Sequence, residues 1–253
     1  MKHDREGKDM ALLIPMDWDS EQLGLSCRRL ECSSALPLQR DTLIAHIAAA
    51  LASDPSADLV AAKIPTSINL PQTLKQVLPT WRVRHLGVEV VHLRVASLPD
   101  SKDNGDVIFY PGTADPSPFL ALAWDMHFSR YHLDPKIGIE RAVSLWKNSI
   151  TDHCRGFAQE TAVISLSGLP AGIATVHMDK TNVRLHIVGV LNWARGQGVG
   201  KRLLQGVIAR YGRTHDIMVE AHEENIAATA LYASAGCHPV ARSDILHFWN
   251  TTR

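Results

Sequence analysis

A glycine-rich segment at residues 195–200, with the sequence RGQGVG, constrains the fold of this chain more than any other feature. The pattern of residues 183–190 before it predicts a strand. After it, apolar residues recur at helical spacing: Leu203, Leu204, Val207, Ile208 and Tyr211. A strand that turns through glycines straight into a helix directs backbone N–H groups and the positive end of the helix dipole at one point. The segment therefore predicts a site for a phosphate or pyrophosphate, which glycine allows the backbone to approach closely.

The spacing of these residues argues against two common phosphate-binding loops. A P-loop has the form GxxxxGK followed by Ser or Thr, but Arg195 stands at the first glycine position and Arg202 follows Lys201. A dinucleotide-binding turn has the form GxGxxG, and here the third glycine, Gly200, arrives one residue early. The remaining alternative to an anion site is a tight connection between a strand and a helix.

A second pattern, NxxAxxLYxxxG, covers residues 225–236. It predicts a helix over residues 225–235 that ends at Gly236. Asn225 and Tyr232 are seven residues apart, which is two helical turns, so both lie on one face with a rise of roughly 10 Å between them. An extended ligand arm is able to touch both. The alternatives are a core aromatic for Tyr232 and an ordinary helix N-cap for Asn225.

These two patterns resemble those of the GNAT N-acyltransferases, which bind acetyl-coenzyme A. The resemblance implies an α/β fold of the α+β kind, with a mixed, mostly antiparallel central sheet flanked by helices. It implies an acetyl-CoA-dependent N-acetyltransferase in which the amine attacks directly in a ternary complex, with acetyl-CoA as co-substrate and no metal. The implied acetyl-CoA contacts are Ile187, Val188, Gly189, Val190, Arg195, Gly196, Gln197, Gly198, Val199, Gly200, Lys201, Asn225 and Tyr232.

The resemblance also implies a general acid. Acetyl transfer passes through a tetrahedral oxyanion and expels a thiolate, and a phenol with a pKa of about 10 stays protonated until that charge develops. Tyr232 is therefore the expected general acid. The family usually has Phe after the glycine that ends the helix, whereas this chain has Cys237, a change that affects packing more than chemistry.

No residue stands out as the general base. Glu220 is the candidate, with His222 and His186 as alternatives, because all three lie on or beside strands expected to flank the cleft. A structural or solvated role is equally open to each of them. Backbone N–H groups of residues 187–190 are expected to polarise the oxyanion, where this strand splays from its neighbour.

Two stretches rich in Pro, Gly, Asp and Ser, residues 98–106 and 111–118, predict a domain boundary. We therefore expect a flexible tail at residues 1–10, a smaller α/β substrate-shaping domain at residues 11–112 and the GNAT domain at residues 113–253. The first domain is expected to contain strands at residues 25–32, 59–64 and 88–95 and helices at 41–52 and 71–78. The second is expected to contain helices at residues 118–128, 139–149 and 225–235 and strands at 161–166, 172–178, 183–190, 217–221 and 245–248.

Two further segments bear on the acceptor amine. Residues 18–24, which begin with Trp18, and residues 128–131, which contain Arg130 and Tyr131, resemble the TDP-fucosamine acetyltransferase group. That resemblance implies the amine of a nucleotide-linked amino-deoxy sugar as acceptor, a role in polysaccharide biosynthesis, and a homodimer. Trp18 is suited to stack on a ring and Arg130 to pair with a phosphate, while a core Trp and a surface Arg are the alternatives.

The chain departs from that group where Gln22 and Leu23 replace its usual aromatic pair, which leaves the sugar or base open. A protein N-terminus or a small amine is therefore the second hypothesis for the acceptor. A non-catalytic acyl-CoA-binding protein is the third hypothesis, against which Tyr232 and Asn225 argue.

Composition argues against several other classes of function. Lys and Arg together number 26, as do Asp and Glu, so the zero formal net charge provides no electrostatic basis for a nucleic-acid partner. The longest apolar stretch, residues 43–52, is about half of the ~20 residues that a membrane span needs, and residues 1–10 lack the apolar region of a secretory signal. The four cysteines form no CxxC pair and the thirteen histidines no cluster at ligand spacing, so we expect reduced thiols, no metal site and a cytoplasmic protein.

Overall fold

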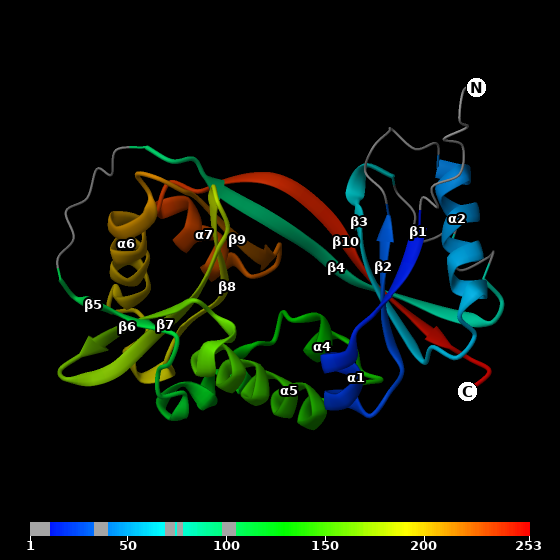
Figure 1. Cartoon of the computed structure of the whole chain (residues 1–253), viewed down its shortest axis with the longest axis horizontal. Helices are drawn as coiled ribbons and strands as arrows, with labels where there is room; N and C mark the ends of the chain where they lie inside the picture. The colour runs from blue at the N-terminus through cyan, green and yellow to red at the C-terminus, as the bar shows by residue number, and fades with distance from the viewer. Residues whose placement is uncertain (1–10, 33–39, 69–73, 75–77, 98–104) are drawn as a thin grey trace, which may run out of the picture. The chain divides into compact units, whose positions relative to one another are not determined.

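The computed structural model describes residues 11–32, 40–68, 74, 78–97 and 105–253 (Figure 1). The expected tail at residues 1–10, most of the expected helix at residues 71–78 and most of the boundary segment at residues 98–106 lie outside the described residues. By its internal contacts the chain divides into two compact units: unit 1 is Met1–Val88 with Ser243–Arg253, and unit 2 is Glu89–Arg242. Strands β4 (Trp81–Arg94) and β10 (His238–Asn250) each begin in one unit and end in the other.

Unit 1 is a small α/β arrangement. Its own elements in chain order are β1 (Ala11–Pro15), α1 (Asp17–Leu23), β2 (Cys27–Cys32), α2 (Arg40–Ser53), β3 (Leu59–Pro65) and the 3₁₀ turn η1 (Thr66–Ile68). β1 pairs antiparallel with β2, β2 pairs parallel with β3, and β3 pairs antiparallel with β10. Parallel neighbours need a crossover connection, which α2 supplies. Leu43, Ile47 and Leu51 of α2 are buried in the core of this unit together with Val60 of β3 and Phe248 of β10.

Unit 2 contains a mixed sheet with the strand order β4-β9-β8-β7-β6-β5. The further strands of this sheet are β5 (Val107–Pro111), β6 (Glu160–Leu166), β7 (Leu169–Met178), β8 (Asn182–Val190) and β9 (Asp216–His222). Neighbours pair antiparallel except for β8 and β9, which are parallel. The mixed, mostly antiparallel sheet expected from the sequence is thereby confirmed.

Helices cover both faces of the unit 2 sheet (Figure 1). On one face lie α6 (Val199–Tyr211) and α7 (Ile226–Ser234), and the predicted apolar stripe of α6 is confirmed because all five of its residues are buried in the core there. On the other face, η2 (Ser117–Asp125) and α5 (Ile139–Asp152) share a core with Ile173 of β7 and Ile187 of β8. The short helix α4 (Arg130–Leu133) and the turns η3 (His153–Phe157) and η4 (Asn192–Ala194) complete the unit.

Some local structure differs from the expectations. β1 and α1 are present although no pattern in the sequence predicts them. The expected helix at residues 118–128 is the 3₁₀ helix η2, in which Phe119 and Leu122 are buried three residues apart, matching three residues per turn. The expected helix at residues 139–149 extends to Asp152 and leads into the wider turn η3, where Gly156 has a φ of 113°.

Residues that precede position 112 also contribute to unit 2, because the second half of β4 pairs with β9 and β5 pairs with β6. The expected domain limits at residues 112 and 113 stay a prediction. All four cysteines are free. Among the described residues, no helix has the length and apolar character needed to cross a membrane.

Candidate functional site

The predicted anion-binding segment connects β8 to α6. After β8 the chain makes the turn η4 and reaches α6 through Gly196 and Gly198, which both have a φ of 73°. Residues with a Cβ rarely adopt this left-handed conformation, so the backbone path requires both glycines. Gly198 is the N-cap of α6 and supplies no side-chain cap, which leaves the first N–H groups of α6 without a partner inside the helix. A Cβ added at either glycine would have no heavy atom within 4 Å, so the space beside these N–H donors is open.

The long side chains of this segment hold its shape. Arg195 donates from Nε to the carbonyl oxygen of Val190 at 3.1 Å and from Nη2 to Asp125 Oδ2 at 2.7 Å. Gln197 donates from Nε2 to the carbonyl oxygen of Trp193 at 3.1 Å. Both side chains are therefore used within the protein, which leaves the backbone N–H groups as the donors for an anion.

β8 leaves its parallel neighbour halfway along its length. The registered pairs between β8 and β9 begin at Asn182 with Asp216 and end at Leu185 with Val219. Residues 188–190 follow this last pair and, among the described strands, are in register with β7 alone, while the N–H of Ile187 donates to Thr175 Oγ1 at 3.0 Å. The strand thus separates from β9 after Leu185, and one edge of residues 188–190 is open. The role of these backbone N–H groups towards an oxyanion stays a prediction.

Tyr232, the predicted general acid, lies on α7 and is only 5% exposed. Burial raises the pKa of the Tyr232 hydroxyl well above its ordinary value, and the neighbouring Cys237 thiol adds to the effect, so the phenol is protonated at neutral pH. Its ring centroid lies 5.6 Å from that of His92 on β4. The burial of Tyr232 and its raised pKa fit a group that has to release a proton only when strong negative charge develops beside it.

His92 is a neighbour of Tyr232 that no motif reveals, because it is one of several polar residues along β4. It is 2% exposed, and neither of its ring nitrogens has a hydrogen-bond partner in the described part of the chain. Burial lowers the pKa of His92, so the imidazole is neutral. The uncharged imidazole therefore adds no formal charge beside the phenol of Tyr232.

Glu220, the candidate base, points to the opposite face of the sheet from Tyr232. Val219 and Ala221 on either side of it share a core with Tyr232, and side chains alternate along a strand. The Glu220 carboxylate accepts a hydrogen bond from Arg184 Nη1 at 3.3 Å. Because the edge of β8 is open towards β9, groups on either face of the sheet are able to reach it.

The alternative bases also lie on that second face. His222 is buried, its ring stacks on that of Phe128 at 5.7 Å, and its Nδ1 accepts a hydrogen bond from the N–H of Glu224 at 3.3 Å. His186 lies on β8 beside two other histidines, His153 and His177. His222 is thus fixed by packing, while His186 belongs to a separate cluster.

Asn225 has the structural role left open by its motif. Its Oδ1 accepts a hydrogen bond from the N–H of Ala228 at 3.2 Å, which makes it the N-cap of α7. A further contact of Asn225 with a ligand stays a prediction. α7 also approaches α6 closely, since a Cβ at Gly200 would lie 3.2 Å from Leu231 Cδ2.

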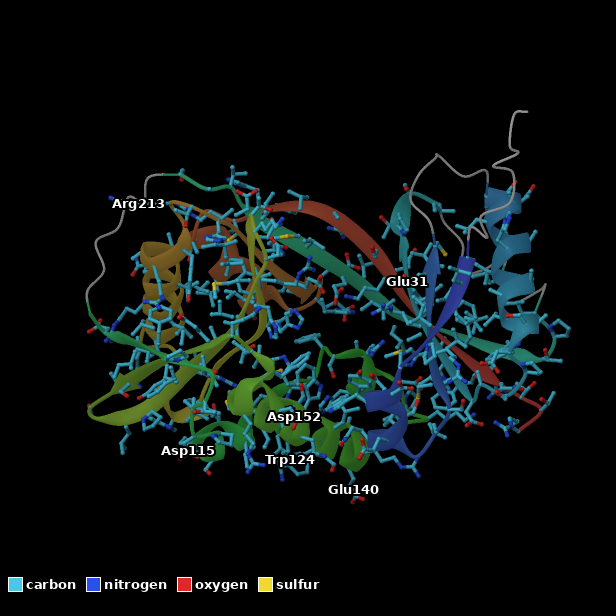
Figure 2. The ribbon with its side chains drawn as sticks, viewed as in Figure 1. Glu31, Asp115, Trp124, Glu140, Asp152 and Arg213 are labelled. Atoms are coloured by element: carbon cyan, nitrogen blue, oxygen red, sulfur yellow. The ribbon has the colours of Figure 1, made fainter. Side chains whose placement is uncertain are left out.

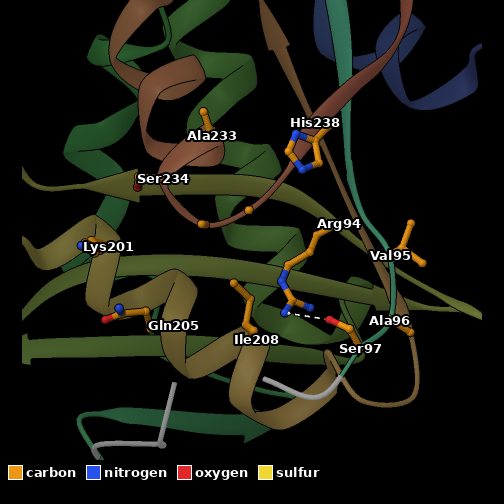
Figure 3. A pocket seen from close by; sticks show the side chains of 12 residues that line it. Arg94, Val95, Ala96, Ser97, Lys201, Gln205, Ile208, Ala233, Ser234 and His238 are labelled. Atoms are coloured by element: carbon orange, nitrogen blue, oxygen red, sulfur yellow. Dashed lines mark hydrogen bonds between the residues drawn. The ribbon is translucent and has the colours of Figure 1, made fainter. Parts of the chain in front are cut away.

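A cavity of about 730 Å³ lies beside α6 and α7 (Figure 3). It is lined by Arg94 at the end of β4 and residues 95–97 after it, by Lys201, Gln205 and Ile208 of α6, and by residues 233–236 with His238. Arg94 donates from Nη2 to Ser97 Oγ at 3.2 Å, and Lys201 is exposed in the first turn of α6 (Figure 3). The cavity therefore presents two cationic side chains, Lys201 at the start of α6 and Arg94 near Gly212 at its end.

The predicted acceptor residues are placed within their own units. Trp18 is half-buried in α1 of unit 1. In α4 of unit 2, the guanidinium of Arg130 lies 4.6 Å from the ring centroid of Tyr131 and donates to its hydroxyl. Ser129 caps α4 and accepts a hydrogen bond from Trp146 Nε1 at 2.9 Å. These contacts fix the shape of the segment at residues 128–131, and its role towards an acceptor stays a prediction.

Residues 122–237 match the family model described as acetyltransferase (GNAT) family. The matched range holds β8, the glycine-rich segment, α6, β9 and α7, which are the elements that build the features above. Among the curated proteins, none matches the sequence.

Solved structures share the fold at low sequence identity. A conserved protein of unknown function from Staphylococcus epidermidis aligns with a TM-score of 0.61 at 14% identity, covering 98% of this chain and 94% of that one. A GCN5-related N-acetyltransferase from Sphaerobacter thermophilus aligns with a TM-score of 0.55 at 16% identity, covering 95% and 76%. A GCN5-related N-acetyltransferase from Kribbella flavida aligns with a TM-score of 0.54 at 13% identity, covering 88% and 81%. The likeness is one of fold, and it extends beyond residues 122–237.

Proposed function

We propose that this chain transfers the acetyl group of acetyl-CoA to the amine of a nucleotide-linked amino-deoxy sugar. The match of residues 122–237 to the GNAT acetyltransferase family model supports the acetyl transfer. The observation that carries the proposal is that the open edge of β8 is followed, a few residues later in the chain, by the glycine-rich N-terminus of α6. The helix N-terminus is suited to bind a pyrophosphate, and the open strand edge offers backbone hydrogen-bonding groups to an extended ligand arm.

The donor is proposed to bind along α6 and β8. The pyrophosphate lies against the N–H groups that follow Gly198, where a Cβ would block its approach. The adenosine and its 3′-phosphate fit the cavity beside α6, whose cations, Arg94 and Lys201, complement the charge of that phosphate. The pantetheine arm then extends along the open edge of residues 188–190 towards α7.

Tyr232 is proposed as the general acid. The neutral amine attacks the thioester carbonyl, and backbone N–H groups on the open edge of β8 stabilise the oxyanion. As the tetrahedral intermediate collapses, Tyr232 gives its proton to the departing thiolate sulfur. Burial keeps this phenol protonated until then, which prevents the proton from leaving before the thiolate forms.

Glu220 is proposed as the base that takes the amine proton through a water molecule. Its ion pair with Arg184 is partly exposed, so water reaches the carboxylate. Glu220→Gln retains the size of the side chain but removes its basicity. We therefore expect this variant to have a lower kcat/KM than the unaltered chain at neutral pH. At alkaline pH, where the free amine predominates, much of the difference should disappear.

The nucleotide sugar as acceptor rests on the likeness of the Trp18 and Arg130 segments to the sugar-nucleotide enzymes. Trp18 belongs to α1 and Arg130 to α4, and both helices are labelled in Figure 1. The direct assay follows release of free CoA thiol from acetyl-CoA in the presence of three separate acceptor sets: nucleotide-linked amino sugars, peptides with free N-termini, and polyamines. Turnover with the sugars alone supports the proposal. Turnover confined to peptides or polyamines contradicts the acceptor, and no turnover with any set contradicts the enzyme.

Tyr232→Phe tests the acid against a matched tyrosine. Tyr211 on α6 is buried to a similar degree, 6% exposed, but its hydroxyl donates to Glu160 inside the protein. We expect Tyr232→Phe to bind acetyl-CoA as before and to lose about 10²-fold or more in kcat. Tyr211→Phe should lower the melting temperature and leave kcat unchanged. Equal kcat values for the two variants would remove Tyr232 from the reaction.

A further inference from the structure

Three histidines from three different elements meet on the η2 and α5 side of the unit 2 sheet. His153 follows directly after α5, His177 lies on β7, and His186 lies on β8. The ring centroids are 5.2 Å apart for His153 and His177, and 4.2 Å for His177 and His186. One nitrogen from each ring lies within 4.8 Å of the others. Asp152, which is labelled in Figure 2, is the last residue of α5, and His153 follows it.

An irregularity of β8 brings the third histidine into this group. Ala174 faces Val188, but Val176 faces Leu185, so the single residue between them on β7 opposes both His186 and Ile187. Leu185 belongs to the core under α6, whereas Ile187 belongs to the core under α5, although residues two apart on a regular strand share a face. The extra residue in β8 thus turns the strand at His186 towards the face that carries His177.

Two of the rings have buried nitrogens without partners. His153 donates from Nδ1 to the carbonyl oxygen of Ser149 at 2.7 Å, which leaves the lone pair of the neutral ring on Nε2. In the described part of the chain, Nε2 of His153 and Nε2 of His177 have no hydrogen-bond partner. An imidazole fixed by a backbone carbonyl on one nitrogen, with its other nitrogen free, is the usual state of a metal ligand.

Two of the three rings are uncharged at neutral pH. Burial, followed by the charges of His186 and His153, lowers the pKa of His177 to about 4. Burial likewise lowers the pKa of His153, against the hydrogen bond to Ser149 and the charge of Asp152. At neutral pH these two rings therefore keep their lone pairs. The carboxyl end of α5 lies beside them, and its dipole attracts positive charge.

We propose that His153, His177 and His186 bind a divalent transition metal ion, for which Zn²⁺ is the test ion. Imidazole nitrogen suits Zn²⁺, Cu²⁺ and Ni²⁺ better than Mg²⁺ or Ca²⁺, which require oxygen. Tetrahedral Zn²⁺ with bonds of about 2.0–2.1 Å places its ligands roughly 3.3 Å apart. The three nitrogens approach that spacing once the exposed His186 side chain turns inward, and a water molecule completes the four ligands.

Zn²⁺ binding to the full chain, measured by isothermal titration calorimetry after dialysis against a chelator, tests this site. We expect one strong site per chain and a higher melting temperature with Zn²⁺, because the ion binds only the folded arrangement. His186→Gln is the decisive variant, because its side chain is exposed and its loss does not disturb a core. Loss of an outer-shell partner costs about 10–100-fold in metal affinity, so loss of this ligand should weaken Zn²⁺ binding by about 100-fold or more.

His215→Gln is the matched control, since His215 is a partly exposed histidine of the same unit whose Nδ1 contacts Thr214 Oγ1 at 2.8 Å. It should bind Zn²⁺ as the unaltered chain does. His177→Gln, checked for folding by circular dichroism, should match His186→Gln. Absence of a strong site in the unaltered chain overturns the proposal. So does Zn²⁺ binding of equal strength in His186→Gln and His215→Gln.

Discussion

Gly198→Ala separates the conformational role of the glycine-rich segment from its proposed role in binding acetyl-CoA. Gly198 has a φ of 73°, and alanine in this left-handed conformation costs about 1–2 kcal/mol. Because a Cβ there meets no heavy atom within 4 Å, no packing clash adds to this cost. Gly168, in the turn between β6 and β7, has a φ of 80° and the same open surroundings. The two alanine variants should therefore lose similar free energies of unfolding.

Ligand binding distinguishes the two variants. Each kcal/mol lowers the melting temperature by about 2–4 °C in a domain of this size, so both should melt roughly 2–8 °C lower. Only at position 198 would the methyl group occupy space beside the pyrophosphate. We expect Gly198→Ala to raise the Kd for acetyl-CoA by about tenfold or more, which corresponds to ~1.4 kcal/mol, and Gly168→Ala to leave it unchanged. Calorimetric titration at a temperature where both are folded measures this. Equal Kd values would refute the placement of the pyrophosphate.

Three further predictions concern stability. A Cβ at Gly206 would lie 2.5 Å from Val107 Cγ2, so Gly206→Ala should separate α6 from β5. We expect the free energy of unfolding, measured with a chemical denaturant, to fall by about 1–3 kcal/mol, less the ~1 kcal/mol that alanine gains in a helix. An unchanged midpoint of unfolding would contradict this close contact. Asn225→Ala removes the N-cap of α7 and should cost about 1 kcal/mol in thermal unfolding, whereas Asn225→Asp should retain most of it. The pKa of Glu160 is lowered below its ordinary value of 4.5, because hydrogen bonds led by that of Arg210 outweigh the opposing effect of burial. The Glu160 carboxylate therefore stabilises the fold above pH 4.5, and this stability is lost as the pH falls through the pKa of the folded state. Unfolding measured from pH 6 to pH 3 should show this loss in the unaltered chain and a weaker one in Glu160→Gln.

The strand and helix pattern of unit 2 was predictable because its signals are local. The stripe of α6 repeats over three turns, and the glycines at 196 and 198 mark a backbone path that other residues rarely follow. The mostly antiparallel sheet followed from the family resemblance rather than from periodicity. β1 and α1 escaped prediction because a five-residue strand and a seven-residue helix with no side-chain cap carry little periodic signal.

Contacts that depend on tertiary structure were beyond the sequence patterns. His153, His177 and His186 are separated by 24 and 9 residues, which matches no metal-binding motif, and only the irregular pairing of β8 turns the last of them towards the others. His92 lies next to Tyr232 through the pairing of β4 with β9, which joins segments far apart in the chain. The ion pair of Glu220 with Arg184 likewise requires the parallel register of β8 and β9.

The division of unit 1 between the two ends of the chain has a consequence for synthesis on the ribosome. β3 is complete by residue 65, yet its partner β10 contributes residues 243–249, which begin 178 residues later in the chain. At about 5–20 residues per second, the interval between them is roughly 10–40 seconds. During that time Val60 and Ala62 of β3 lack Phe248 and Leu246 from the core that they will share. Unit 2, whose residues are contiguous, is completed first, so the nascent chain is expected to acquire its structure from the middle outwards.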